Sequence, residues 1–197
     1  MKPYTIAVPL LLLIATGCGR ENTDVTAPAE VPAATAPATD TAGLGAVALP
    51  EFVQKAAMTD MFEIEAGKIA RERASSAAIK SFARQMVTDH TATSAQLKGI
   101  LATETGAPVI PTALDQAHLD KLARLRSAEA ADFDGLYLDQ QTEAHENALN
   151  LLQTYAQNGE NARVKAFAAE VAPKVSAHLE MVRGLDRQGA DDMKSKS

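Results

Sequence analysis

Apolar side chains recur every three to four residues almost continuously from Pro50 to Leu185, and this helical period limits what the chain can fold into. Aromatic residues make up only 4% of the sequence and tryptophan is absent, which argues against a β-sandwich of aromatic and β-branched strands. Turn-forming residues interrupt the period, so four long helices and one short helix are predicted, over residues 50–74, 76–105, 115–126, 127–158 and 161–185. The expected fold is an all-α bundle.

Each predicted helix boundary has a local chemical reason. Ser76 can cap the second helix, and Pro108 and Pro111 lie in the turn that ends it. Gly159 ends the fourth helix. Pro173 lies inside the last helix, where the period continues beyond it, so a bend near residues 169–173 is predicted rather than an end.

The N-terminus has the features of a secretory signal peptide over residues 1–17: Lys2, then the apolar run Ile6–Ala15. The run is about half the roughly 20 residues of a membrane-spanning helix, so a permanent transmembrane anchor is not expected. Cys18, the only cysteine, follows Gly17 and resembles the acylated cysteine of the bacterial lipobox, which implies membrane attachment through lipid. The alternative is a soluble periplasmic protein cleaved nearby.

The segments that flank the predicted bundle have no helical period. Residues 18–49 are rich in alanine, threonine and proline, which predicts a disordered linker between a lipidated Cys18 and the bundle. The bundle is assigned to residues 50–187, and residues 188–197 are predicted to be a frayed tail. These boundaries describe a helical domain on a tether.

The charge and the cysteine content exclude several classes of function. The chain has 19 Lys and Arg against 25 Asp and Glu, and loss of Lys2 with the signal peptide leaves 18 basic residues. An acidic chain is not expected to bind nucleic acid by phosphate neutralisation. One cysteine cannot build an iron–sulfur cluster or a cysteine-rich zinc site. No protein partner is indicated by any motif.

Four polar residues occupy the apolar stripes of the four long helices: Glu63, His90, His145 and His178. Burying such groups is costly unless they are paired or bound to metal. Counting residues from the turns places Glu63 and His90 about 4.5 Å apart in height, and His145 and His178 about 7 to 8 Å apart. A shared explanation is therefore needed for all four.

Two explanations remain open from the residues alone. One is a hydrogen-bonded core network completed by carbonyls or buried water. The other is a site for one transition-metal ion, zinc, copper or iron, with Glu63 and the three histidines as ligands. Asp89, Glu143 and Glu146 adjoin the histidines in sequence and are candidate partners of the ligands. His118 is interpreted as an exposed residue outside the site.

Several short motifs, taken together, resemble a bacterial envelope family named domain of unknown function 4142. They are Phe52, Glu63 and Gly67; the run Met86-Val87-x-Asp89-His90; Phe133-Asp134 with Tyr137; and His145, Phe167, Pro173 and His178. The resemblance covers residues 50–185. It implies a ferritin-like four-helix fold, here with an extra short helix, and a location at the outer membrane on the periplasmic side.

The resemblance to a ferritin-like fold does not predict a di-iron site in this chain. Such sites use Glu-x-x-His pairs, whereas Val87, Thr142 and Val175 stand three residues before the core histidines. The function expected from the sequence is therefore that of a lipoprotein with a non-catalytic binding or structural domain that holds a metal ion in its core. The alternative is a metal-dependent redox enzyme, or a metal storage or stress protein.

Overall fold

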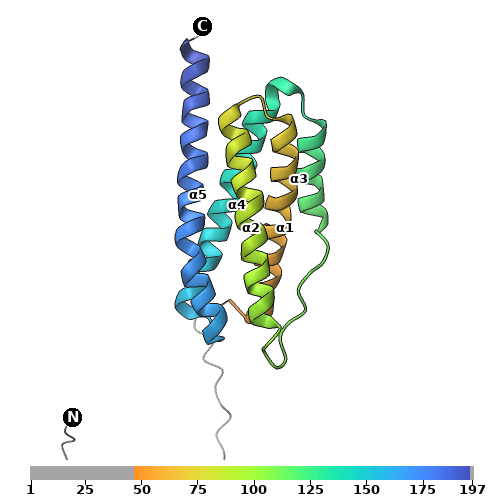
Figure 1. Cartoon of the computed structure of the whole chain (residues 1–197), viewed down its shortest axis with the longest axis vertical. Coiled ribbons are helices and arrows are strands. Elements are labelled where there is room, and N and C mark those ends of the chain that lie inside the picture. The colour runs from red at the N-terminus through yellow and green to blue at the C-terminus, as the bar shows by residue number, and fades with distance from the viewer. Residues whose placement is uncertain (1–46, 196–197) are drawn as a thin grey trace, which may run out of the picture. The chain divides into compact units, whose positions relative to one another are not determined.

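A computed structural model describes residues 47–195, and within this range the secondary structure consists of helices without strands. The helices run antiparallel in pairs, as Figure 1 shows. Their bounds are α1 Leu49–Arg73, α2 Ala77–Leu101, α3 Gln116–Ser127, α4 Ala130–Asn158 and α5 Ala162–Ser195. The predicted all-α bundle with a short extra helix is confirmed.

Local capping explains where the helices begin. Pro50 lies in the first turn of α1, where its missing N–H costs nothing. The Ser76 side chain accepts a hydrogen bond from the backbone N–H of Ile79 and so caps α2, as predicted. Asp134 of α4 adds a second cap, because its carboxylate accepts the backbone N–H groups of Ser75 and Ser76 at 2.9 and 3.0 Å. The α1–α2 turn is therefore fixed to α4.

The main contacts pair α1 with α2 and α4 with α5, while α1–α4 and α2–α5 contacts close the bundle. The short helix α3 lies against α1 and α4. Gly67 allows α1 and α2 to approach closely, because a Cβ atom there would lie 2.8 Å from Val87 Cγ2 and 2.9 Å from the Ala83 carbonyl oxygen.

The core has an apolar cluster towards each end of the bundle. One cluster includes Phe62, Phe82 and Tyr137. The other includes Phe52 and Phe167. The buried polar residues lie between these two clusters along the long helices, except that Glu63 directly follows Phe62 of the first cluster. They are Asp60, Glu63, His90, Thr93, Gln140, Gln141, His145 and His178. The middle of the bundle is thus a polar layer enclosed by apolar ones.

The described residues include only part of the segments that flank the bundle. The predicted signal peptide, Cys18 and most of the predicted linker lie outside the described residues. Helix α5 continues past Pro173 and also through residues 188–195, where a frayed tail was predicted. Among the described helices, none combines the length and the apolarity that a bilayer crossing requires.

Candidate metal centre

Three histidine side chains from three helices meet in the polar layer. His90 of α2, His145 of α4 and His178 of α5 each offer one ring nitrogen within 4.8 Å of the other two. The ring centroids are 5.6 Å apart for His90–His145, 5.8 Å for His90–His178 and 5.5 Å for His145–His178. All three residues are at most 4% exposed. We call these residues the histidine triad.

Each ring of the histidine triad is held through one nitrogen. The contacts join His90 Nδ1 to Asp60 Oδ1 at 2.7 Å, His145 Nδ1 to the Gln141 carbonyl oxygen at 2.8 Å, and His178 Nε2 to Asp89 Oδ2 at 2.9 Å. The other nitrogen of each ring, Nε2 of His90, Nε2 of His145 and Nδ1 of His178, is buried without a partner. One anchored and one available nitrogen is the arrangement of metal-ligating histidines.

The protonation of two of the three rings also suits metal binding. Burial lowers the pKa of His145 to about 3, with a further contribution from charge on His90. Burial and the same charge lower the pKa of His178. Burial alone would lower the pKa of His90 as well, but Asp60 and the nearby carboxylates Glu63 and Asp89 outweigh it and raise that pKa. Two rings are therefore neutral at pH 7, which is the form that binds metal.

Glu63 of α1 adjoins the histidine triad without belonging to it. Its Oε1 lies 4.0 Å from His145 Nδ1, and both carboxylate oxygens are buried without a hydrogen-bond partner. Burial raises the pKa of Glu63 to about 7, against the opposing effects of His90 and the Gln141 amide. A carboxylate in this state can change its charge near neutral pH and compensate a bound cation.

The spacing of the three rings fits one ion after a small adjustment. Nitrogens that bind one tetrahedral ion at about 2.0 to 2.1 Å lie about 3.3 Å from one another. Because the triad nitrogens are within 4.8 Å, each ring has to move inward by less than about 1 Å. Side-chain rotations of a few tens of degrees supply such a shift.

The structure brings some of the predicted site residues together and separates others. Glu63 and the histidine triad share the middle layer, and Asp89 contacts His178 rather than its sequence neighbour His90. Glu143 and Glu146 lie elsewhere, in ion pairs at the surface with the half-buried Lys121 at 2.9 Å and with Arg183 at 2.7 Å. Neither of these two carboxylates is within hydrogen-bond distance of a triad ring.

Two residues beside the triad were not predicted from the sequence. Asp60 and Gln141 are buried and anchor His90 and His145. Asp60 lies three residues before Glu63, and Gln141 lies four residues before His145. Each therefore shares a helix face with a predicted site residue, and this spacing could have identified both.

His118 was expected to be exposed, and the structure corrects this. Its side chain is 26% exposed and its Nδ1 lies 2.6 Å from Asp115 Oδ1. The ring also packs against Phe62, with centroids 5.4 Å apart. The amphipathic pattern of a helix as short as α3 did not reveal this contact.

Comparison with known proteins gives one family and one structural neighbour. The sequence profile of a family described as a domain of unknown function, DUF4142, matches residues 32–185. The solved structure of CopM in the Cu(II)-bound form has a TM-score of 0.62 at 17% identity, over 73% of this chain and 98% of CopM. At this identity the similarity shows the fold alone. No curated protein sequence matches the chain significantly.

Proposed function

The chain belongs to the DUF4142 family, and in its helical domain we propose that His90, His145 and His178 bind one transition-metal ion, with copper(II) preferred. The observation that carries the proposal is the set of three buried ring nitrogens without partners, on rings whose other nitrogens are held by Asp60, Gln141 and Asp89. Orphaned buried nitrogens cost free energy, and a shared ion satisfies all three together.

The preference for copper rests on donor chemistry and on the structural neighbour. Imidazole nitrogens bind zinc, copper, iron and nickel, and copper(II) is the tightest of the divalent ions in this series. CopM has the same bundle fold and is known in a Cu(II)-bound form, which supports copper as the metal to test first. Glu63, buried beside the triad, is placed to balance the added positive charge.

The surroundings of the triad favour a holding role over catalysis. Beside His90 and Asp60 lies a cavity of about 30 Å³ with almost wholly apolar walls. A space of this size is far smaller than the cavities that bind organic substrates. We therefore propose a metal-binding module rather than a redox enzyme.

Metal retention after loading tests the proposal directly. Purified protein is loaded with copper(II) in the presence of equimolar zinc(II), dialysed, and analysed for both metals. The wild type is expected to keep about one copper per chain, whereas His90→Ala, His145→Ala and His178→Ala lose it. His118→Ala is the matched control, because it removes an imidazole outside the triad and keeps the copper.

The result that overturns the proposal is a wild-type protein that elutes free of metal after dialysis and still melts cooperatively. In that case the triad is a structural hydrogen-bonded network. The histidine variants then lose only stability, about 1 to 3 kcal/mol for each buried partner left unpaired.

We also propose that the domain is held in the cell envelope through lipid on Cys18, at the outer membrane on the periplasmic side. The support is the apolar run Ile6–Ala15 followed by Gly17-Cys18 in the sequence. Mass spectrometry of the mature N-terminus is expected to find an acylated Cys18. An unmodified N-terminus at another residue contradicts this.

Because the chain is acidic, no salt-sensitive binding of nucleic acid is expected in a gel-shift titration.

A further inference from the structure

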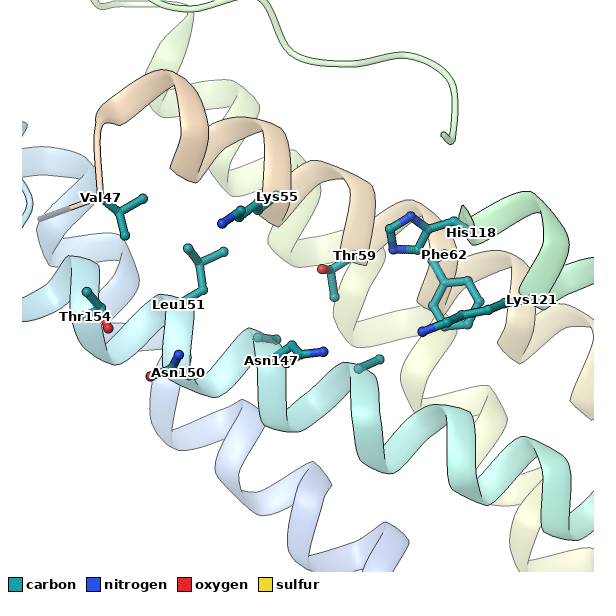
Figure 2. Close-up of a pocket in the computed structure, with 12 residues that line it drawn as sticks. Val47, Lys55, Thr59, Phe62, His118, Lys121, Asn147, Asn150, Leu151 and Thr154 are labelled. Carbon is teal, nitrogen blue, oxygen red and sulfur yellow. The ribbon is translucent and has the colours of Figure 1, made fainter. Parts of the chain in front are cut away.

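A groove between α1 and α4 lies apart from the histidine triad. It has a volume of about 370 Å³, and the first turns of α3 close it at one end (Figure 2). Phe62, Ala148 and Leu151 supply much of its apolar lining. We call it the α1/α4 groove. Its volume lies within the range of small-molecule sites in proteins.

The charge of the α1/α4 groove differs from that of the whole chain. Acidic residues outnumber basic ones by 25 to 19 in the sequence, yet none of the groove's lining residues is Asp or Glu. Lys55 extends into it from α1 and Lys121 from α3, as Figure 2 shows. Their present partners are Glu51 at 2.6 Å, in an exposed pair, and Glu143 at 2.9 Å, in a partly exposed pair; such pairs contribute little free energy, so a ligand can replace them.

The groove also offers polar groups that are not in use. Asn147 and Asn150 stand three residues apart on one face of α4 and line the groove together with Thr59. Within the described part of the chain, their side chains make no hydrogen bond. Amide and hydroxyl donors beside ammonium groups, over an apolar surface, match a ligand with an anionic head and an apolar body.

We propose that the α1/α4 groove binds a small amphipathic anion, a carboxylate or phosphate head on a short apolar chain. The head is held by a lysine ammonium and an asparagine amide, and the chain lies on Phe62 and Leu151. No triad residue lines the groove, so this site goes beyond the metal site and does not depend on it. Thr59, Ala148 and Leu151 line both the groove and the small cavity beside His90.

Calorimetric titration of the mature, full-length protein tests the ligand class with four probes that share one apolar chain. Octanoate and octyl phosphate carry the anionic head, octanol is neutral and octylamine is cationic. One molar equivalent of an anionic probe is expected to bind, at least about tenfold more tightly than octanol or octylamine. The tighter of the two anions identifies the head group. Equal affinity for octanol or octylamine overturns the proposal.

Charge reversal on the surface locates the binding. Lys55→Glu and Lys121→Glu are each expected to weaken octanoate binding roughly fivefold, since each replaces an attraction by a repulsion at a partly solvated position. Lys98→Glu, at an exposed site of α2 outside the groove, is the matched control and changes the affinity less than twofold. An equal effect of the control variant contradicts a specific site.

An amide NMR titration completes the test, because it does not depend on variants. Octanoate is expected to shift the side-chain amide signals of Asn147 and Asn150 at saturation. Shifts confined to another face overturn the proposal. Absence of binding by both anionic probes overturns it as well, including the case in which the chain's own residues before Val47 already fill the groove.

Discussion

Replacing Glu63 by glutamine in the metal-free protein changes how stability depends on pH. The Glu63 side chain is fully buried, and its two oxygens lack hydrogen-bond partners. Burial raises its pKa from the ordinary value of 4.5 to about 7. The folded state therefore holds a proton on Glu63 more tightly than the unfolded state does, and ionising this carboxyl near neutral pH costs stability.

The sign and size follow from these two values. A raised pKa stabilises the fold fully below pH 4.5, and this contribution is lost as the pH rises through about 7. Between pH 5 and pH 8 the wild type loses about 2.5 kcal/mol through Glu63 alone. Glutamine has a similar shape and does not ionise, so the Glu63→Gln variant lacks this loss.

Urea unfolding of both proteins at several pH values, with a chelator present, measures the effect. From pH 5 to pH 8 the stability of the variant is expected to rise relative to the wild type by about 2.5 kcal/mol, or roughly 5 to 10 °C in Tm. Glu65→Gln is the matched control, since Glu65 is exposed and paired with Lys68. Its profile should run parallel to that of the wild type. Parallel profiles for the Glu63 variant refute the reasoning.

Three further predictions concern packing and capping. Gly67→Ala is expected to lower the free energy of unfolding by about 1 to 3 kcal/mol, because the new methyl group meets Val87 Cγ2 and the Ala83 carbonyl. The control Gly135→Ala, on an open face of α4, is expected to raise it by about 0.5 to 1 kcal/mol. Equal stabilities of the two variants in urea unfolding contradict the close approach. Arg73→Met removes hydrogen bonds to the carbonyls of Leu125, Arg126 and Ala128 and a contact with the Phe133 ring. The backbone amides of α3 should then exchange faster, and the free energy of unfolding should fall by about 1 to 3 kcal/mol. Unchanged hydrogen exchange in α3 contradicts this prediction. Asp134→Ala removes the second cap of α2 and is expected to cost about 1 to 2 kcal/mol, and a melting temperature equal to that of the wild type argues against the cap.

The helices were predictable because their boundaries depend on local chemistry. Ser76, Gly159 and the prolines after α2 act on the few residues next to them, whatever the rest of the bundle does. The level of the polar layer was also predictable, since counting turns along straight helices gives heights. Both kinds of information are contained in short stretches of sequence.

The pairing inside the polar layer was not predictable in the same way. Glu63 and His90 were predicted at similar heights, but His90 contacts Asp60, and Glu63 lies 4.0 Å from His145. Asp60 and Glu63 share one face of α1, so the choice between them depends on the rotation of α1 against α2 and α4. Tertiary packing sets that rotation, and no single helix sequence contains it.

Sequence neighbours of the histidines were unreliable for a related reason. Successive residues on a helix point about 100° apart, so a carboxylate next to a triad histidine in sequence faces a different helix. Asp89 consequently meets His178 of α5 instead of His90, and Glu146 meets Arg183 of α5 at the surface. Asp60, a turn before Glu63, was the better candidate by this geometry.

The three proposed ligands come from distant parts of the chain, 55 residues apart between His90 and His145 and 33 between His145 and His178. In an unfolded chain these imidazoles rarely meet, so an ion that bridges them binds the native state and scarcely the denatured one. Free metal at 100 times its Kd then adds about 2.7 kcal/mol to the stability. A chain still lacking its last helix has only two of the three rings. If the proposed site binds metal, metal capture there would report that the bundle has closed.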